Sequence, residues 1–525
     1  MIRRCWLSGL NAVGGFRVNL AVVGCGDILS ESGGWRATEV ARRADRATDL
    51  RPGITVTVHT VLVQPLTTAP PLGGTFWQVE TPRRRVPGRL TIFPTPALET
   101  LGPLFEERAY RVEVSGHSAT VSIGGDSDDH VADWSPRDIH GVLDDGREVS
   151  LVGAQGGKAS GNTGSSQQYR QWFGTIRHAI FDIHVDREHP FSACRFRLTG
   201  PNWFRHTDGQ AATVEGGEIV SVTEGRDHWF EFSPVTPMSV SDFDTAVVHP
   251  IQTIATLLTT SRAEAVELSV RHSPNSSWLR VHRHERPVPT GHHELFDASF
   301  LTPERCALWV DFRRRSNGLD AVVVDDLTGV AIQTAVLTLA AVAEGLHRRL
   351  YPDRKRVPAL SRPDLRAARK AARSAALESV RAADRAGRPE LTAADLAAFG
   401  AAMDSAFGHI NDATFRTMMN DLAGTAMAAV PGIVAEFADW PATIHSVRNI
   451  LAHRGTEEDR SAHEHFIKTA VAVSYSLQWV LRTVLLVEAQ VDATDIGEAY
   501  GRSSAYNHHH SNVREFLTGT PHARR

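Results

Sequence analysis

The sequence predicts an α+β protein of more than one domain, with a β-rich, sandwich-like or barrel-like half followed by an all-α helical bundle. Between residues 71 and 325, short runs of Val, Ile, Thr, Phe and Trp alternate with Gly, Pro and Asp turns, a pattern typical of antiparallel strands. From residue 326 onward, apolar residues recur at helical spacing. The chain has 525 residues, too many for one ordinary core, so two or three domains are expected.

Composition limits the classes of function. Hydrophobic residues make up 42% of the chain, charged residues make up 22%, and the net charge is −4; such values are typical of a soluble globular protein. Any contact with nucleic acid must therefore come from a local basic patch. The four cysteines are scattered without a CxxC pair, which favours neither a zinc site nor a disulfide framework and suits the cytoplasm.

No membrane span, metal or cofactor is expected. The most apolar stretch, 469–491, carries Gln478, Arg482 and Glu488 and is interpreted as a buried helix. Adjacent histidines in 507–512 would point in different directions, which disfavours a tetrahedral metal site. The Asp-rich turn at 124–130 lacks the closing glutamate of a calcium loop.

Residues 1–70 show no clean periodicity. They are interpreted as an N-terminal extension without a predicted fold, or as an artefact of start-site choice. A secretory signal is disfavoured because Gly, Asn and Arg17 interrupt the apolar run.

The β-rich half is predicted to span residues 71–325. A hairpin is expected at 139–155, where an Asp-Asp-Gly turn joins two alternating runs. One helix is expected at 243–260, broken or kinked by Pro250. The Gly/Ser stretch 153–166 is interpreted as a long mobile loop. Further short strands are expected at 75–94, 109–125, 178–185, 194–200, 228–232, 265–272 and 306–312.

The helical half is predicted to span residues 326–505, with residues 506–525 as a tail. The first helix, 328–350, places its apolar residues on one stripe, and a basic, alanine-rich helix follows at 364–387. Expressed alone from about residue 321, this bundle is expected to stay soluble. Further helices are expected at 392–407, 411–429, near 432–440, at 441–454 and at 461–490.

A polar stripe interrupts the apolar pattern near the end of this half. His445, Asn449 and His453 are spaced i, i+4 and i+8, and Arg448 flanks them, so they share one side of a short helix. Pro441 suits its first turn, and Gly455 stands where the helix is expected to stop. The stripe lies beside the apolar side chains of Ile444, Val447, Ile450 and Leu451.

These residue types suit the cleavage of RNA without a metal. Arginine is a permanent, forked cation that matches phosphate oxygens, and histidine exchanges protons near neutral pH. Residues five apart on one helix are separated by about 140° in rotation, so a two-fold pairing of helices would bring two sets into one groove. The alternative is an ordinary surface helix whose polar face is merely solvated.

The segment Arg448-Asn449-Ile-Leu-Ala-His453 resembles the R-x4–6-H motif of HEPN domains. Residues 341–352 look like the first HEPN helix, and 461–490 look like the helix that follows the motif. Residues 75–94 followed by 137–154 are similar to the N-terminal domain of the ApeA family, which precedes a C-terminal HEPN domain. The resemblance covers roughly residues 75–500.

The resemblance implies a metal-independent endoribonuclease of anti-phage, abortive-infection defence, with transfer RNA as its substrate class. It implies that Arg448 and His453 are catalytic and that Asn449 is the polar motif residue. Glu344 is a supporting candidate, or else a solvated helix charge near His347, and His445 is a second supporting candidate.

The geometry of the polar stripe favours a homodimer joined through the helical half. The resemblance further implies a β-rich half that senses a phage-derived trigger. The alternative function is a non-catalytic HEPN-like protein that dimerises or binds RNA as a sensor or adaptor.

Overall fold

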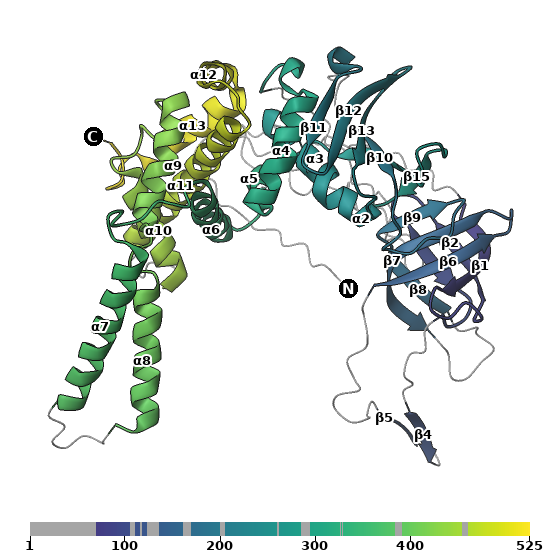
Figure 1. The fold of residues 1–525 in the computed structure, drawn as a ribbon, viewed down its shortest axis with the longest axis horizontal. Coiled ribbons are helices and arrows are strands. Elements are labelled where there is room, and N and C mark those ends of the chain that lie inside the picture. Colours follow the sequence, from purple (N-terminus) through teal and green to yellow (C-terminus); the bar gives the residue numbers. More distant parts are fainter. Residues whose placement is uncertain are drawn as a thin grey trace, which may run out of the picture. The chain divides into compact units, whose positions relative to one another are not determined.

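A computed structural model describes residues 70–524, apart from 105–110, 116–117, 123–135, 161–169, 200–204, 260–261, 285–294, 326, 328, 384–390 and 454–459. The predicted N-terminal extension up to residue 69, the Asp-rich turn at 124–130, residues 161–166 of the Gly/Ser stretch and Gly455 lie outside these residues. The loop predicted for the Gly/Ser stretch is wrong for residues 153–160, which belong to a strand that ends at Ser160 and pairs with its neighbour. The fold is α+β, as predicted, with a sheet region followed by a helical region (Figure 1).

Antiparallel strands at the start of the described chain close into a barrel in the order β7-β6-β1-β2-β3-β8, with β8 also pairing with β7. Its interior holds fully buried side chains, among them Phe76, Leu90 and Phe173. Gly141 makes room for Phe76, since a Cβ at that glycine would lie 2.5 Å from the phenyl ring. The strands are β1 (Leu72–Gln78), β2 (Val86–Thr91), β3 (Ala97–Thr100), β6 (Arg137–Leu143), β7 (Glu148–Ser160) and β8 (Arg170–Thr175).

The predicted hairpin at 139–155 is confirmed as β6 and β7. Gly146 adopts a positive φ of 86° in the turn, a conformation that glycine adopts without steric cost. The turn is closed by the amide of Leu143, which donates to the carbonyl of Arg147 at 2.9 Å. The separate strands β4 (Arg111–Ser115) and β5 (Ser118–Ser122) pair with each other, in the region where 109–125 was predicted to be extended.

The sheet continues beyond the barrel through β9, which pairs with both β7 and β15. Its order from there is β9-β15-β14-β10-β13-β12-β11, antiparallel throughout. The strands predicted within 178–185, 194–200, 228–232 and 265–272 are confirmed. The bounds are β9 (His178–Phe181), β10 (Ala193–Leu198), β11 (Ala211–Val214), β12 (Gly217–Glu224), β13 (Asp227–Pro234), β14 (Ala265–Arg271) and β15 (Leu279–His282), with a short 3-10 turn η2 (Arg205–Thr207).

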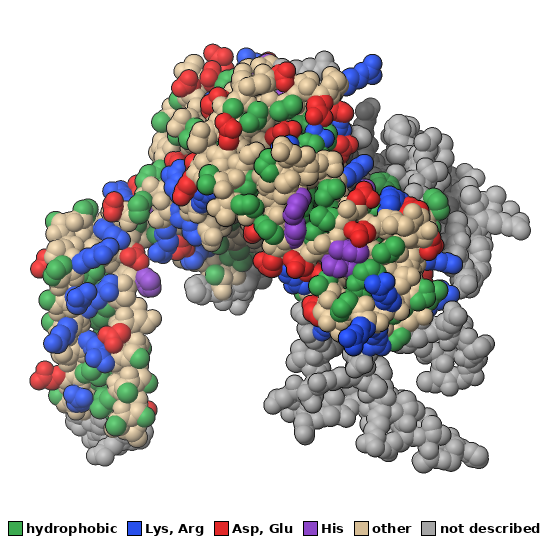
Figure 2. Space-filling view, turned by 45° about the vertical axis from the view of Figure 1, so that its right-hand side comes forward, with side chains coloured by type: hydrophobic (Ala, Val, Ile, Leu, Met, Phe, Trp, Pro, Cys, Tyr) green, Lys and Arg blue, Asp and Glu red, His purple; other side chains and the backbone are tan. Residues whose placement is uncertain are grey.

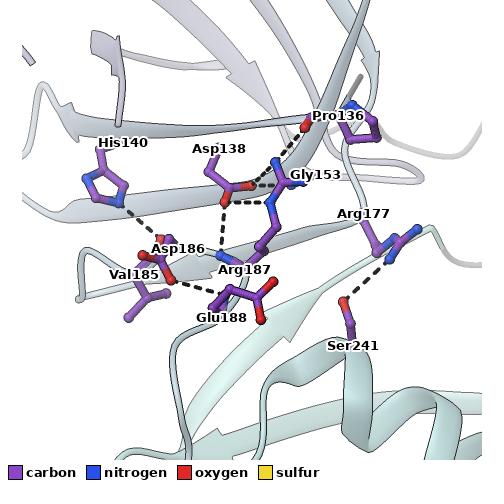
Figure 3. Close-up of polar contacts among 10 residues, drawn as sticks. All are labelled: Pro136, Asp138, His140, Gly153, Arg177, Val185, Asp186, Arg187, Glu188 and Ser241. Atoms are coloured by element: carbon purple, nitrogen blue, oxygen red, sulfur yellow. Dashed lines mark hydrogen bonds and ion pairs between the residues drawn. The ribbon is translucent and has the colours of Figure 1, made fainter. Parts of the chain in front are cut away.

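A buried carboxylate fixes one end of the barrel to the loop after β9. Asp138 on β6 accepts hydrogen bonds from the amides of Gly153 and Arg187, both at 2.9 Å, and from the Arg187 side chain at 3.1 Å. Figure 3 shows these groups converging on Asp138. On the same side of the barrel, Arg177 reaches Ser241 on α2 (Val240–Phe243) at 3.5 Å. The loop is therefore held by a carboxylate whose oxygens are fully used.

The predicted inserted helix is confirmed, and its irregularity has a cause. The chain runs from α2 through a π-helical segment, η3 (Asp244–Val248), into α3 (His249–Leu258). Pro250 is the second residue of α3 and lies inside this continuous helical run, just after the π-helical segment. Because proline lacks an amide hydrogen, the irregularity falls where the hydrogen-bond pattern changes, and the helix continues beyond it.

The prediction of a strand at 306–312 is wrong, because these residues belong to helix α4 (Pro303–Ser316). Thr302 caps its start by accepting a hydrogen bond from the amide of Arg305, Pro303 stands in the first turn, and Asn317 ends it in the left-handed region. These capping signals outweigh the local strand propensity. The short 3-10 turn η4 (Ala298–Phe300) precedes α4, and α5 (Leu319–Val324) follows it.

The helical half is arranged around the long helix α11 (Arg460–Glu488). Its segment His463–Glu488 is long and apolar enough to cross a membrane, but 78% of its most apolar window is buried within the protein, as in a core helix. Against α11 pack α6 (Ile332–Leu350), α9 (Phe415–Ala429), α10 (Trp440–His453), α12 (Ala493–Arg502) and α13 (Ser504–Leu517). The helices α7 (Arg362–Ala382) and α8 (Ala393–Gly408) pack on each other as a hairpin.

Two expectations for this half differ from the structure. The residues predicted as a helix near 432–440 form successive turns before α10, beginning at Pro431, which cannot donate a helical hydrogen bond. The residues expected to form a tail after 505 instead continue α13, whose Tyr506, Val513 and Leu517 are buried in the bundle.

The hydrophobic core does not divide at the predicted boundary of 325/326. One cluster of buried side chains runs from Ile180 on β9 to Leu517 on α13, and it includes Trp309 on α4 and Val336 on α6. The barrel interior forms a separate cluster. The division between the two cores therefore lies within β9, where Ala179 belongs to the barrel cluster and Ile180 belongs to the larger cluster.

Arg482, within this continuous core, connects α11 of the helical half with α3 of the sheet region. This α11 side chain is buried, and its Nη2 lies 2.6 Å from the carbonyl oxygen of Thr256 and 2.7 Å from that of Leu257, with Thr259 a third acceptor. These carbonyls belong to the C-terminal end of α3, which lacks partners within its own helix and carries a partial negative charge. Burial lowers the pKa of the guanidinium, but arginine stays charged.

We expect Arg482→Met to lower the free energy of unfolding by roughly 3–5 kcal/mol, because three buried carbonyls lose their donor. The measurement is urea unfolding of the full chain. Arg502→Met, at an exposed position of α12, is the control and should change stability by less than about 0.5 kcal/mol. Equal effects of the two substitutions would contradict the capping role.

We also expect a fragment of residues 326–525 to aggregate or unfold, contrary to the sequence-based expectation for the isolated bundle. Such a fragment lacks α3, α4 and α5, whose side chains pack in the same core as α6 and α11. A fragment of residues 176–525 keeps that core and should unfold cooperatively as a soluble species. Size-exclusion chromatography and thermal unfolding compare the two, and a monodisperse, cooperative 326–525 fragment would show that the core is divisible.

Candidate functional site

The polar stripe predicted from the sequence lies on α10, and the helix is fixed at its start. The Asp439 carboxylate accepts a hydrogen bond from the amide of Ala442 at 2.9 Å, and the Trp440 indole donates to Ser476 on α11 at 2.9 Å. The apolar stripe is confirmed, with Ile444, Val447 and Leu451 all buried. This packing fixes which face of α10 points away from the core.

Three of the predicted site residues lie together on that face. The Asn449 amide nitrogen is 3.1 Å from Nε2 of His445, one helical turn away, and Nη1 of Arg448 is 3.5 Å from the Asn449 oxygen. If the amide donates to Nε2, a neutral His445 carries its proton on Nδ1. Asn449 therefore links the histidine and the arginine side chains.

Glu344 joins this group from α6. Its Oε2 is 3.7 Å from Nη2 of Arg448, and its Oε1 accepts a hydrogen bond from Arg348 at 2.9 Å. This hydrogen bond raises the pKa of the Arg348 guanidinium. His347, the neighbour considered in the alternative reading of Glu344, is buried and bonds to Asp421 on α9 at 2.9 Å.

A short network of charges continues from Glu344 toward the loop before α9. Arg348 also lies 3.5 Å from Asp412, which accepts a hydrogen bond from His409 at 2.8 Å. Partial burial acts to raise the pKa of Asp412, but His409 and Arg348 outweigh it and hold that pKa below its usual range. The two cations Arg348 and Arg448 share the carboxylate of Glu344.

Phe415, at the start of α9, orients the same side chains. The guanidinium carbon of Arg448 lies 5.1 Å from the centre of its ring, and the His445 ring lies 6.1 Å from it. A cation over an aromatic face is attracted by the ring electrons. Sequence reasoning missed Phe415 and Asp412, which come from another part of the chain; Arg348 could have been found from its i, i+4 spacing to Glu344.

Arg448 is therefore positioned but remains reachable. Its side chain is 38% exposed, and its ion pair with Glu344 is long at 3.7 Å, so the pair is weak and a phosphate can compete for it. His453 is the last residue of α10, and its side chain lies outside the described residues. The structure thus brings together Arg448, Asn449, His445 and Glu344, and places the backbone of His453 on the same helix.

Among the residues that the structure describes, no group of three or more His, Cys, Asp or Glu side chains is arranged to hold a metal ion. At the stripe itself, Glu344 is the nearby carboxylate, and both of its oxygens face arginines. The arrangement offers a cation, an amide and the imidazole of His445, which suits stabilisation of a phosphate and proton transfer.

A second feature, which the sequence did not indicate, is a cleft of about 1260 Å³ beside the barrel. It is bordered by the end of β8, by α3 and by α5, and charged side chains line it. In it Asp244 bonds to His178 at 2.9 Å and to Arg283 at 2.6 Å, while Arg313 pairs with Asp320 at 2.8 Å. The cations are thus largely neutralised by carboxylates of the same wall.

Comparison with known proteins adds no relative. No protein-family model, no curated protein and no solved structure matches the chain. The functional assignment therefore depends on the residues of the chain and their geometry.

Proposed function

We propose that this protein is a metal-independent endoribonuclease of the HEPN type. The observation that supports it is the grouping of Arg448, Asn449 and His445 on the outward face of α10, joined by Glu344 from α6. A helical face that presents a forked cation beside an imidazole, on the helix that carries the R-x4-H sequence, suits attack on an RNA phosphate.

In the proposed reaction the 2′-hydroxyl of the RNA attacks the adjacent phosphorus, and the bond to the 5′-oxygen breaks. His453 transfers a proton, either from the 2′-oxygen or to the leaving 5′-oxygen. Arg448 stabilises the charge that develops on the phosphate oxygens. Asn449 and His445 position Arg448, and Glu344 restrains it until a phosphate replaces the carboxylate as its partner.

The wider setting is proposed on the resemblance to the ApeA family. The protein would cleave transfer RNA in the cytoplasm as an abortive-infection defence against phage. The β-rich half would sense a phage-derived trigger, and the charged cleft between β8 and α3 offers a place where a polar ligand could bind.

One observation favours a second candidate, a non-catalytic sensor or adaptor that uses the bundle for dimerisation or RNA binding. Arg448 already contacts Glu344 and Phe415, which also suits a purely structural arginine. Substitution distinguishes the two, because a structural arginine is needed for stability and a catalytic one is needed for cleavage.

We expect Arg448→Ala and His453→Ala each to abolish cleavage of transfer RNA while the fold is kept. Arg448 is partly exposed and its ion pair is weak, so its removal should cost less than about 1 kcal/mol. The measurements are cleavage of purified RNA on denaturing gels and urea unfolding. Arg502→Ala and His508→Ala, the same residue types at exposed positions of α12 and α13, are the matched controls.

Cleavage should persist in excess EDTA, since the proposed reaction uses Arg448 and His453 in place of a metal, and both oxygens of Glu344 face arginines. Normal cleavage by both variants would show that the site is elsewhere. Loss of the fold with Arg448→Ala would favour the structural role.

The active species is proposed to be a two-fold symmetric dimer in which two α10 helices face each other. One helix separates Arg448 from His453 by about 140°, whereas two related helices line one groove with both pairs. Mixing an Arg448→Ala chain with a His453→Ala chain yields heterodimers that keep one arginine and one histidine. We expect the mixture to regain partial cleavage, measured after co-refolding or co-expression, relative to either variant alone.

The controls for this experiment are each variant mixed with itself at the same total concentration. A monomer in solution that cleaves RNA at full rate would overturn the dimer proposal and leave the catalytic assignment in place.

A further inference from the structure

The hairpin of α7 and α8 contains a concentration of positive charge that the proposed active site does not use. α7 carries six cationic and two acidic side chains, a net charge of +4 in a chain whose total is −4. None of its residues is buried, so its cations are not needed to neutralise a core. Figure 2 shows Lys and Arg side chains gathered along this hairpin, at the left of the view.

Five of these cations follow one side of α7. Arg362, Arg366, Lys370, Arg373 and Arg381 are spaced i, i+4, i+8, i+11 and i+19, and all are exposed. At about 100° per residue they fall within an arc of roughly 100°, and at 1.5 Å rise per residue they extend over about 28 Å. We call these five side chains the basic stripe.

The described polar contacts that hold α7 against α8 use only one cation of the basic stripe, Arg373. Arg369, beside the stripe, bonds to the carbonyl of Gly408, and Arg373 pairs with Asp404 at 3.1 Å, both on α8. Within the part of the chain that the structure describes, no ion pair is found for Arg366, Lys370 or Arg381. Three of the five cations of the stripe thus face solvent, with no carboxylate paired to them among the described residues.

The base of the hairpin adjoins the candidate active site. Asn411, just after α8, accepts a hydrogen bond from the amide of Val357 at 2.8 Å and fixes the segment that leads into α7. The next residue, Asp412, contacts Arg348, and Arg348 bonds to Glu344, the partner of Arg448. A ligand that lies along α7 therefore comes close to the ion pairs that connect Asp412, Arg348 and Glu344 with the candidate site.

We propose that the basic stripe binds the phosphate backbone of the RNA substrate and directs it to Arg448. This inference rests on the proposed function for the identity of the substrate. A duplex nucleic acid carries about one phosphate per 1.7 Å, so 28 Å offers roughly sixteen, enough to engage every cation of the stripe. Such contacts position a substrate without reading its sequence. Specificity for one cleavage site must then arise near α10.

The test is a triple variant of the full chain, Arg366→Gln, Lys370→Gln and Arg381→Gln. Glutamine keeps helix propensity close to that of lysine and arginine, and the three side chains are exposed, so α7 should stay folded, as circular dichroism can verify. The charge-matched control is Arg226→Gln, Arg280→Gln and Arg502→Gln, three exposed positions outside the hairpin.

Binding is measured by fluorescence anisotropy with labelled transfer RNA in EDTA at several salt concentrations. We expect the triple variant to raise Kd about tenfold at low salt and to reduce the slope of log Kd against log salt by about 2 to 3. The control should match the wild type. In cleavage assays the triple variant should raise KM and leave kcat close to the wild-type value.

Wild-type affinity and salt dependence in the triple variant would overturn the inference, whatever the cleavage assay shows. The triple variant is also tested for binding to phosphatidylserine vesicles. If it lost binding to these vesicles but bound RNA like the wild type, the inference would be overturned in favour of a membrane surface as the ligand. Hairpin-dependent RNA binding without any cleavage would support the stripe and overturn the proposed nuclease instead.

Discussion

The contact of Arg482 with the end of α3 is the constraint on which the joining of the two halves depends. A buried charge is stabilised by hydrogen bonds to its donors, and here Nη2 of Arg482 donates to the carbonyls at the end of a helix in the sheet region. The central helix of the bundle and the helix beside the sheet are therefore fixed in register, and the surrounding apolar side chains form one core.

This rigidity has a consequence for the candidate site. α10 packs on α11 through Trp440 and its apolar stripe, and α6 packs on α11 as well. The separation of Glu344 from Arg448 is thus set by the same helix that is tied to α3. A change in the sheet region that shifted α11 would alter this ion pair, which gives the proposed sensing half a physical connection to the proposed catalytic residues.

Sequence patterns predicted best those elements whose structure is determined by residues close together in the chain. The β6–β7 hairpin follows from its Asp-Asp-Gly turn, and the two faces of α10 follow from helical spacing. α4 was mistaken for a strand because Cys306, Trp309, Val310 and Phe312 read as a short apolar run, while the helix is specified by Thr302-Pro303 before it and Asn317 after it. Phe415 and the buried cap of Arg482 could not be predicted, since each depends on residues distant in sequence that only packing brings together.

The closed barrel determines how copies of this chain can associate. Strand addition requires an exposed edge with unpaired amides, and at one end of the described sheet the return of β8 to β7 removes that edge. At the other end lies β11, a strand of four residues, which α4 packs against, and Arg314 of α4 pairs with Glu215 in the turn that follows β11 at 2.9 Å. Neither end of this thirteen-stranded sheet leaves a long open template, so its ends disfavour association through strands, and the helical surfaces are the better candidates for symmetric pairing.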